Sequence, residues 1–246
     1  MLEKDQAMEK FSPLLLVFLL VLCACRKDKK TSPADCRTAT MIVNSGAATS
    51  IYSFSYNNEG KLSRLVSKQD EVVFDYTGNG YVITYLTSGK MRQQTTVKTD
   101  AQQRPTEALI KLFKADGTFD SEVITCEYNA KGELVKQVSQ KDKQPAVTTA
   151  TVWADGNCTA ISNNTQSLTL EYYTDRPVQP ADIFRINQLL IQGFVNVFNR
   201  NLAKSLKSGA TITQYSYTFD ADGRVITATA VTGASTETRA FQYSCD

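Results

Sequence analysis

The sequence contains no histidine. Histidine is the general base of Ser-His-Asp and Cys-His catalytic sites and a frequent ligand of zinc. Its absence therefore excludes these catalytic arrangements and all histidine-ligated metal sites. The chain also lacks an excess of either charge, because 27 Lys and Arg residues face 25 Asp and Glu residues and leave a net charge of +2. This balance argues against nucleic acid as a partner.

Long apolar runs are missing as well. A membrane-spanning helix needs about 20 apolar residues, whereas the run near the N-terminus, residues 14–22, has nine. This length is typical of the apolar core of a signal peptide. Residues 22–25, Leu-Cys-Ala-Cys, resemble the lipobox of bacterial lipoproteins. The resemblance implies cleavage after Ala24 and attachment of lipid, palmitate included, to Cys25. The alternative is a buried apolar segment with two core cysteines.

These features predict three segments. Residues 1–24 are a lipoprotein signal peptide, and residues 25–36 contain the lipidated Cys25 and a flexible tether. The tether is polar, because residues 26–35 read RKDKKTSPAD, a composition typical of flexible linkers. Residues 37–246 then form a single antiparallel β domain.

Four cysteines remain once Cys23 is removed with the signal peptide and Cys25 is lipidated, namely Cys36, Cys126, Cys158 and Cys245, and they allow three pairings. An even number in an oxidising compartment is typical of disulfide pairs. Cys36 and Cys245 bracket the domain, so a bond between them would tie the first strand to the last, and it leaves Cys126–Cys158 as the second pair. Four buried thiols are the alternative. No two of these cysteines have the spacing of a zinc site.

A turn pattern recurs along the domain. An aromatic strand end is followed by Asn or Asp, two further residues and Gly, and then by a new strand; the clearest copies begin at Tyr56, Tyr128 and Phe219. Asn or Asp caps such a turn through its side chain, and Gly supplies the positive φ. The flanking residues alternate between apolar and polar. We predict an all-β, mainly antiparallel fold, a strongly curled meander or half-barrel of about fourteen strands.

One stretch departs from this alternation. Residues 181–207 show helical spacing, for example at Ile183, Ile186 and Leu190, and Asp182 can cap the start. The apolar stripe is wide, which predicts a buried amphipathic helical segment over about 181–207, lying on the concave face of the sheet. An amphipathic helix at a membrane surface is the alternative.

Taken together, these motifs resemble a known group of proteins. The lipobox, the Tyr-[Asn/Asp]-x-x-Gly turns, the strand TLEYYTDRP at residues 169–177 and the closing YTFDADGRV and FQYSCD segments are similar to those of a family of Bacteroidetes-type outer-membrane lipoproteins with a porin-like β fold. The resemblance implies an architecture and carries over no catalytic residue, cofactor or metal ligand.

The sequence favours a non-catalytic cell-envelope protein that is anchored to the outer membrane, with the periplasmic or cell-surface side left open. Its partners would be the membrane, through the lipid, and a glycan, a peptide or an outer-membrane protein. The lone tryptophan, Trp153, is the candidate ligand-contact aromatic residue. One alternative is a structural subunit that docks on an outer-membrane transport complex. Another is a carboxylate-based hydrolase, for which Glu171 and Asp175 could act with Glu107 or Asp120.

Overall fold

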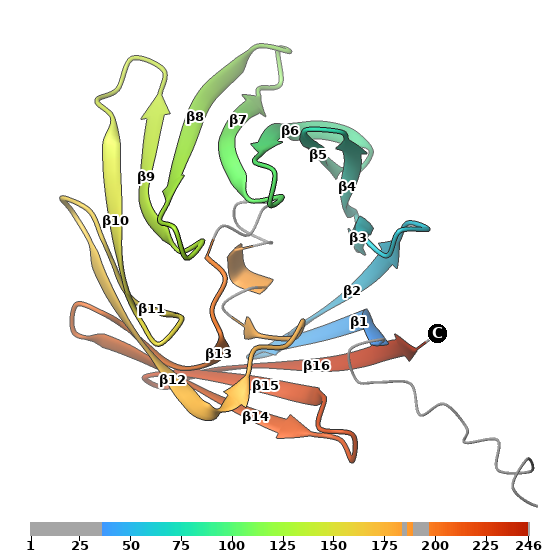
Figure 1. Cartoon of the computed structure of the whole chain (residues 1–246). Helices are drawn as coiled ribbons and strands as arrows, with labels where there is room; N and C mark the ends of the chain where they lie inside the picture. Colours follow the sequence, from blue (N-terminus) through green and yellow to red (C-terminus); the bar gives the residue numbers. More distant parts are fainter. Residues whose placement is uncertain (1–35, 184–185, 189–196, 246) are drawn as a thin grey trace, which may run out of the picture.

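The computed structural model describes residues 36–183, 186–188 and 197–245, which form an antiparallel β-barrel that closes on itself (Figure 1). Each strand pairs with the next along the chain, and the last pairs with the first. The strands are β1 (Cys36–Ser45), β2 (Ala48–Tyr56), β3 (Leu62–Ser67), β4 (Asp70–Thr77), β5 (Gly80–Thr87), β6 (Lys90–Thr99), β7 (Pro105–Phe113), β8 (Phe119–Tyr128), β9 (Leu134–Lys141), β10 (Val147–Ala154), β11 (Asn157–Ser162), β12 (Ser167–Pro177), β13 (Asn201–Ser208), β14 (Thr211–Phe219), β15 (Val225–Thr232) and β16 (Ser235–Cys245).

The barrel confirms the predicted all-β antiparallel class and corrects its extent. A half-barrel of about fourteen strands was expected for residues 37–246, whereas the sheet has sixteen strands and is closed. Closure comes from the pairing of β1 with β16, which runs from Cys36 opposite Cys245 to Ser45 opposite Glu237. A closed sheet leaves no edge strand open to pairing with another chain. The sequence did not predict closure, because the alternation of apolar and polar residues within one strand does not show that the first strand pairs with the last.

Most large apolar side chains lie inside the barrel, together with a few buried polar ones such as Thr95 and Arg239, whereas the outer face carries both polar and apolar side chains. Two buried clusters fill the interior, one around Ile83, Val97 and Leu134, the other around Met41 and Val225. Side chains on neighbouring positions of a strand point to opposite faces. The neighbours of buried residues therefore point outward, and they include charged side chains that form cross-strand ion pairs.

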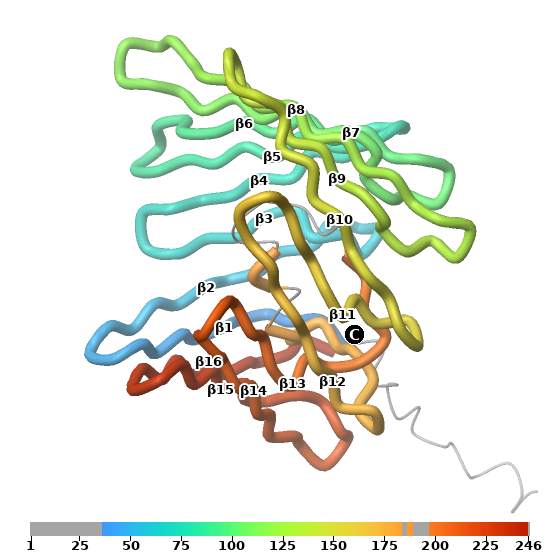
Figure 2. The backbone as a smooth tube through the Cα atoms, turned by 90° about the vertical axis from the view of Figure 1, so that its left-hand side faces the viewer, coloured from blue at the N-terminus to red at the C-terminus, as the bar shows by residue number. Residues whose placement is uncertain are grey.

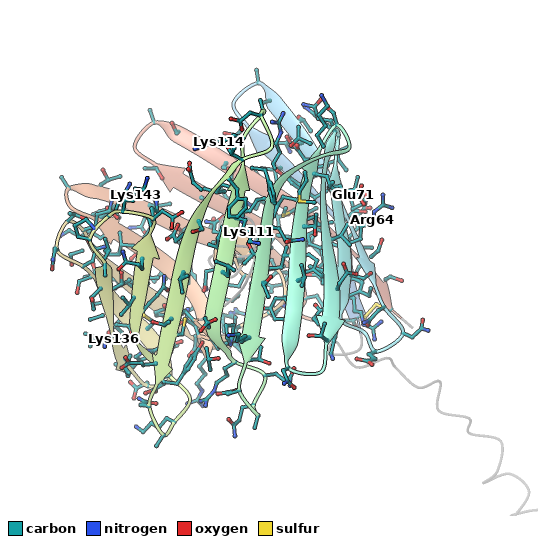
Figure 3. All side chains as sticks on the ribbon, turned by 90° about the horizontal axis from the view of Figure 1, so that it is seen from above. Arg64, Glu71, Lys111, Lys114, Lys136 and Lys143 are labelled. Atoms are coloured by element: carbon teal, nitrogen blue, oxygen red, sulfur yellow. A yellow bond between two sulfur atoms is a disulfide. The ribbon has the colours of Figure 1, made fainter. Side chains whose placement is uncertain are left out.

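The outward ion pairs join adjacent strands. They connect Arg64 Nε with Glu71 Oε1 at 2.7 Å, Lys98 Nζ with Glu107 Oε1 at 2.7 Å, and Lys136 Nζ with Glu127 Oε1 at 2.8 Å. Figure 3 shows Arg64, Glu71 and Lys136 on the outer wall.

The chain enters the barrel after β12. The described residues of this segment, 181–183 and 186–188, lie inside the ring of strands (Figure 1), and Ala181, Ile183 and Ile186 are part of the second cluster. Ile186 N–H donates to the carbonyl of Asp182 at 2.9 Å, which is the first helical hydrogen bond. The predicted burial of a helical start at Asp182 against the concave face is thus confirmed.

The predicted extent of this helix, 181–207, is wrong at its C-terminal part. Residues 201–208 form strand β13, which pairs with β12 and β14. Leu202 and Leu206 are four residues apart, and a spacing of four fits both a helical face and one face of a strand. Residues 189–196, which include Leu190, lie outside the described residues. No helix among the described residues is long and apolar enough to span a membrane.

The two ends of the barrel differ in their turns. Turns that follow even-numbered strands lie at the end that also holds Cys36 and Cys245, which we call the disulfide end; it is the right-hand end in Figure 2. The carboxylate of Asp220 there accepts the N–H groups of Asp222 at 3.0 Å and Arg224 at 2.9 Å. Asn57 and Asn129 make the same pair of bonds with their side-chain oxygens. This is the turn that the sequence pattern predicted.

A fourth copy of this turn has no glycine. Asp100 accepts the N–H groups of Gln102 and Arg104, both at 2.9 Å, and Gln103 stands in the glycine position with a φ of 62°. The left-handed region costs free energy in a non-glycine residue, and the Asp100 side chain helps to hold it. This copy escaped the sequence pattern because the pattern required an aromatic residue and a Gly, whereas Thr99 precedes Asp100 and Gln103 replaces the Gly.

Aromatic side chains link neighbouring strands at the disulfide end. Four tyrosine hydroxyls each donate a hydrogen bond to a backbone carbonyl near the start of the preceding strand, at 2.6–2.9 Å. They belong to Tyr56, Tyr76, Tyr128 and Tyr243. Each of these rings also has a cationic side chain within 6 Å of its centroid, contributed by Arg37, Lys61, Arg104 and Arg224. These contacts tie β2, β4, β8 and β16 to their preceding strands at this end.

Candidate functional site

The most irregular part of the wall is the C-terminal half of β12. Its pairing with β13 is interrupted between Tyr172 and Pro177, so residues 173–176 bulge from the sheet. On its other side β12 pairs with β11 only through residues 167–169. The two strands therefore diverge from Thr159 and Leu170 toward the disulfide end, and the bulge stands between two depressions.

Side chains bridge the gap between β11 and β12. The hydroxyl of Tyr172 donates to the carbonyl of Cys158 at 2.7 Å, and the Cys158 N–H donates to Asn199 Oδ1 at 2.8 Å. The Arg200 N–H donates to the carbonyl of Gly156 at 3.0 Å. The backbone groups that a regular sheet would pair are thus satisfied in another way, as buried polar groups require.

Asn157 holds the chain where it leaves the interior. Its Oδ1 accepts the N–H groups of Arg200 at 3.0 Å and Asn201 at 2.9 Å, and its Nδ2 donates to Asn201 Oδ1 at 3.1 Å. The side chain is buried. Asn157 therefore fixes the start of β13 against the turn between β10 and β11.

We expect Asn157→Ala to lower the free energy of unfolding by about 2 kcal/mol, because it removes a buried side chain that makes three hydrogen bonds, including the one that accepts the part-buried Asn201 N–H. Asn163→Ala is the matched control, since Asn163 Oδ1 also accepts two backbone N–H groups, those of Thr165 and Gln166, but in an exposed turn. Water can replace the acceptor there, so the control should lose less than about 1 kcal/mol. Urea unfolding of both variants measures the difference, and equal losses would contradict the role given to Asn157.

A polar groove of about 540 Å³ opens along this gap. It is lined by the carboxylates of Asp155, Glu171 and Asp175, by Arg200, by the hydroxyls of Thr159 and Thr174, by the amides of Asn157 and Asn201, and by Ala154, Leu170, Tyr172 and Pro177. This volume falls within the range of small-molecule sites. Both amide atoms of Asn157 and the Thr159 hydroxyl are already hydrogen-bonded within the protein, so the charged side chains are the main polar groups that the groove offers to a ligand.

An aromatic pocket of about 170 Å³ lies on the other side of the bulge, lined by Tyr173, Arg176, Ser216, Tyr217 and Phe219. The rings of Tyr173 and Tyr217 meet edge to face with centroids 6.1 Å apart. The guanidinium carbon of Arg176 lies 4.8 Å from the Phe219 centroid. Tyr173 is fixed by a hydrogen bond from its hydroxyl to the Tyr215 carbonyl at 2.9 Å.

Trp153, the aromatic residue predicted to contact a ligand, packs against the first buried cluster. Its indole N–H donates to the Leu134 carbonyl at 2.6 Å. The next residue, Ala154, lines the groove, so Trp153 lies behind the groove rather than among its lining side chains.

The carboxylates considered for hydrolysis are separated. Glu171 and Asp175 line the same groove, but Glu171 Oε2 accepts the Ser205 hydroxyl at 3.0 Å and Asp175 pairs with Arg176 at 3.4 Å. Glu107 and Asp120 lie on β7 and β8, in ion pairs with Lys98 and Lys114. The structure therefore does not bring either of them to Glu171 and Asp175.

The predicted disulfides divide into one that forms and one that does not. Cys36 and Cys245 are bonded, across a sequence separation of 209 residues. Cys126 and Cys158 are both buried thiols, which corrects the predicted Cys126–Cys158 bond. They lie on β8 and β11, three strand spacings apart or roughly 14 Å along the sheet, farther than a disulfide can reach.

Burial raises the pKa of the Cys158 thiol to about 12. Cys25 lies outside the described residues.

Metal chemistry finds no support within the described part of the chain. No group of three or more Cys, Asp or Glu side chains there is placed to hold a metal ion. The acidic turn at Asp220 and Asp222 uses its carboxylates on backbone N–H groups and on Arg224.

The groove and the pocket were not predicted as sites from sequence. Their signal lies in the adjacent tyrosines of the TLEYYTDRP strand, because Tyr172 bonds to β11 while Tyr173 bonds to β14. In a regular strand, two neighbouring residues point to opposite faces of the sheet. Here the two tyrosines instead bond to the strands on either side of β12, which indicates that the strand is broken at this point. Both depressions form at this break.

Comparison with known proteins bears on the fold. No protein-family model matches the sequence, and no curated protein matches it. Solved structures that are similar to the barrel include two porin-like proteins. A porin-like protein from Bacteroides uniformis ATCC 8492 has a TM-score of 0.63 at 14% identity over 84% of this chain and 96% of that one. A porin-like protein from Bacteroides vulgatus ATCC 8482 has a TM-score of 0.56 at 11% identity over 84% and 98%. At these identities the likeness establishes a porin-like β fold.

Proposed function

We propose that this protein is a non-catalytic binding protein of the cell envelope, anchored to the outer membrane through Cys25, which holds a glycan or a peptide in the groove beside the β12 bulge. The observation that carries the proposal is the groove itself. It is a space of about 540 Å³ with converging polar side chains, on a barrel whose interior holds buried clusters. The carboxylates there are engaged separately, which favours binding over hydrolysis.

The outer wall supports anchoring by lipid rather than by the barrel. Charged side chains on the lipid-facing side of a membrane barrel destabilise it by roughly 2–4 kcal/mol near the bilayer midplane. Here outward positions of β3, β6 and β9 carry Arg64, Lys98 and Lys136, each in a cross-strand ion pair. Such a wall suits water, so the barrel would stand beside the membrane at the end of the tether.

Two measurements on the full-length protein test the proposal. Trypsin added to isolated outer membranes should cut the tether at Arg26, Lys27, Lys29 or Lys30 and release the barrel into the supernatant. A panel of oligosaccharides and peptides should then include members that raise the thermal unfolding midpoint by several degrees. Asp175→Lys, in the groove, should abolish this rise. Asp75→Lys, at an exposed position of β4, should leave this rise unchanged.

A cut barrel that stays with the membrane pellet would contradict the anchoring, and a panel in which no member shifts the midpoint would contradict the binding function.

A further inference from the structure

The β12 bulge separates two depressions of different chemistry. On one side is the groove with Asp155, Glu171 and Asp175. On the other is the aromatic pocket with Tyr173 and Phe219. Within the bulge itself, Thr174 and Asp175 line the groove while Tyr173 and Arg176 line the pocket. One short segment therefore contributes to both depressions.

We propose that the two depressions are consecutive subsites for one neutral or amino oligosaccharide, which crosses the bulge of residues 173–176. This inference rests on the proposed binding function and names its ligand class. A pocket of about 170 Å³ is smaller than the roughly 300–1,000 Å³ that small-molecule sites occupy. It therefore suits one part of a ligand whose remainder lies in the groove.

The side chains in the groove match the donors of a sugar. Carboxylates accept hydrogen bonds, and sugar hydroxyls supply them, while Arg200 and the hydroxyl of Thr174 can donate to ring and glycosidic oxygens. The Thr159 hydroxyl donates to the Val152 carbonyl and is left as an acceptor. Three carboxylates against Arg200 and the Arg176 that pairs with Asp175 leave the groove with a net negative charge, which disfavours uronates and other acidic sugars. Neutral and amino sugars remain.

The aromatic pocket matches the apolar face of a sugar ring. Tyr173, Tyr217 and Phe219 present ring carbons beside the exposed Arg176 and Ser216. Aromatic rings bury apolar area while their edges accommodate polar neighbours. The Tyr173 hydroxyl is occupied by the Tyr215 carbonyl, so contact with this residue is made through its ring.

The state of the backbone argues against an extended peptide as the occupant. A peptide that adds to a sheet needs unpaired backbone groups along the strand edge. In the gap, the Cys158 N–H and carbonyl are taken by Asn199 and Tyr172, and the Gly156 carbonyl is taken by the Arg200 N–H. On the β11 side of the gap, recognition is therefore left to side chains, which favours a hydroxyl-rich ligand.

The test is calorimetric titration of the full-length protein with neutral and amino oligosaccharides of one to four units, and with oligogalacturonates of the same lengths. We expect affinity to rise at least tenfold from one unit to three, with no binding of oligogalacturonates. Phe219→Leu keeps an apolar side chain but removes the aromatic ring, and it should abolish the gain in affinity with length. Asp175→Asn should weaken binding of every length at least fivefold.

Phe113→Leu is the matched control. Phe113 lies on β7 with its ring tilted against Phe119 at a centroid distance of 5.7 Å, away from the bulge, so this variant should bind as the unaltered protein does. Equal affinity for one and three units, or an unaltered length dependence in Phe219→Leu, would overturn the inference. If peptides bind, saccharides do not, and Asp175→Lys blocks the peptides, the proposed function stands and this inference is wrong. If neither class binds, both are wrong.

Discussion

Replacing both Cys36 and Cys245 by serine is expected to lower the free energy of unfolding by about 5 kcal/mol, because the bond closes a loop of 209 residues in the unfolded chain. In the chain-entropy model the contribution grows with loop length, and this loop spans nearly the whole barrel. The bond also lies where β1 meets β16, and Arg224 Nη1 is 2.9 Å from Cys36 Sγ and 3.0 Å from Cys245 Sγ.

Urea unfolding with and without dithiothreitol measures this effect. The unaltered protein should lose the same free energy on reduction as on double substitution, and the double variant should not respond to the reductant. Cys158→Ala is the control, because this residue is a buried thiol, and its variant should stay sensitive to dithiothreitol. A loss below about 1 kcal/mol in the double variant would mean that strand pairing alone holds the closure.

The bond between the ends of the barrel was predictable from sequence because only the outermost cysteines can tie the first strand to the last. The second pair was not predictable in this way. Which of the remaining cysteines share a strand pair depends on the strand order, and Cys126 and Cys158 are separated by β9 and β10. Sequence distance carries no information about this separation.

The turns at the disulfide end were predictable because their chemistry is local. Asn57, Asn129 and Asp220 bond to N–H groups two and four residues ahead, and such bonds depend only on neighbouring residues. Strand β13 was predicted as helix because the four-residue spacing of Leu202 and Leu206 fits one face of a helix and one face of a strand equally well. Its pairing with β12 and β14 shows that it is a strand.

The candidate site was largely hidden from sequence analysis. The groove depends on where β11 and β12 cease to pair, and that point is set by Asn157 and Asn199, which are 42 residues apart in the chain and meet at the exit from the interior. Glu171 and Asp175 were singled out as carboxylates near a strand end, and they do line the groove. The Ser205 hydroxyl bonds to Glu171, and Arg176 pairs with Asp175, so the two carboxylates have separate partners.

Alkaline pH is expected to unfold the barrel cooperatively between about pH 10 and 12. Burial raises the pKa of Tyr85 and of Tyr243 to about 12, and burial also raises the pKa of Tyr81, Tyr172 and Tyr217. A raised pKa means that the folded state holds the proton more tightly than the unfolded chain does. The stability that these groups contribute is therefore complete below pH 10 and is lost as the pH rises toward their folded pKa.

The loss should be large because several such groups act together. A tyrosine in the unfolded chain ionises near pH 10, so at pH 11 each deeply buried phenol costs about 1 kcal/mol of stability. Tyr81, Tyr85, Tyr172 and Tyr217 together reach about 4 kcal/mol, against a typical total of 5–15 kcal/mol. Phenolate absorbance at 295 nm should therefore appear together with the loss of the β-sheet circular dichroism signal.

Tyr85→Phe isolates one of these contributions. The Tyr85 hydroxyl is buried and makes no hydrogen bond to the described residues, so its removal should leave stability at pH 7 unchanged or slightly raised. At pH 11 the variant should be more stable than the unaltered protein by about 1 kcal/mol, since it has no phenol to ionise on unfolding. Gradual ionisation near pH 10 in a barrel that keeps its circular dichroism signal would contradict this account, because it would mean that the inner wall admits water to its tyrosines.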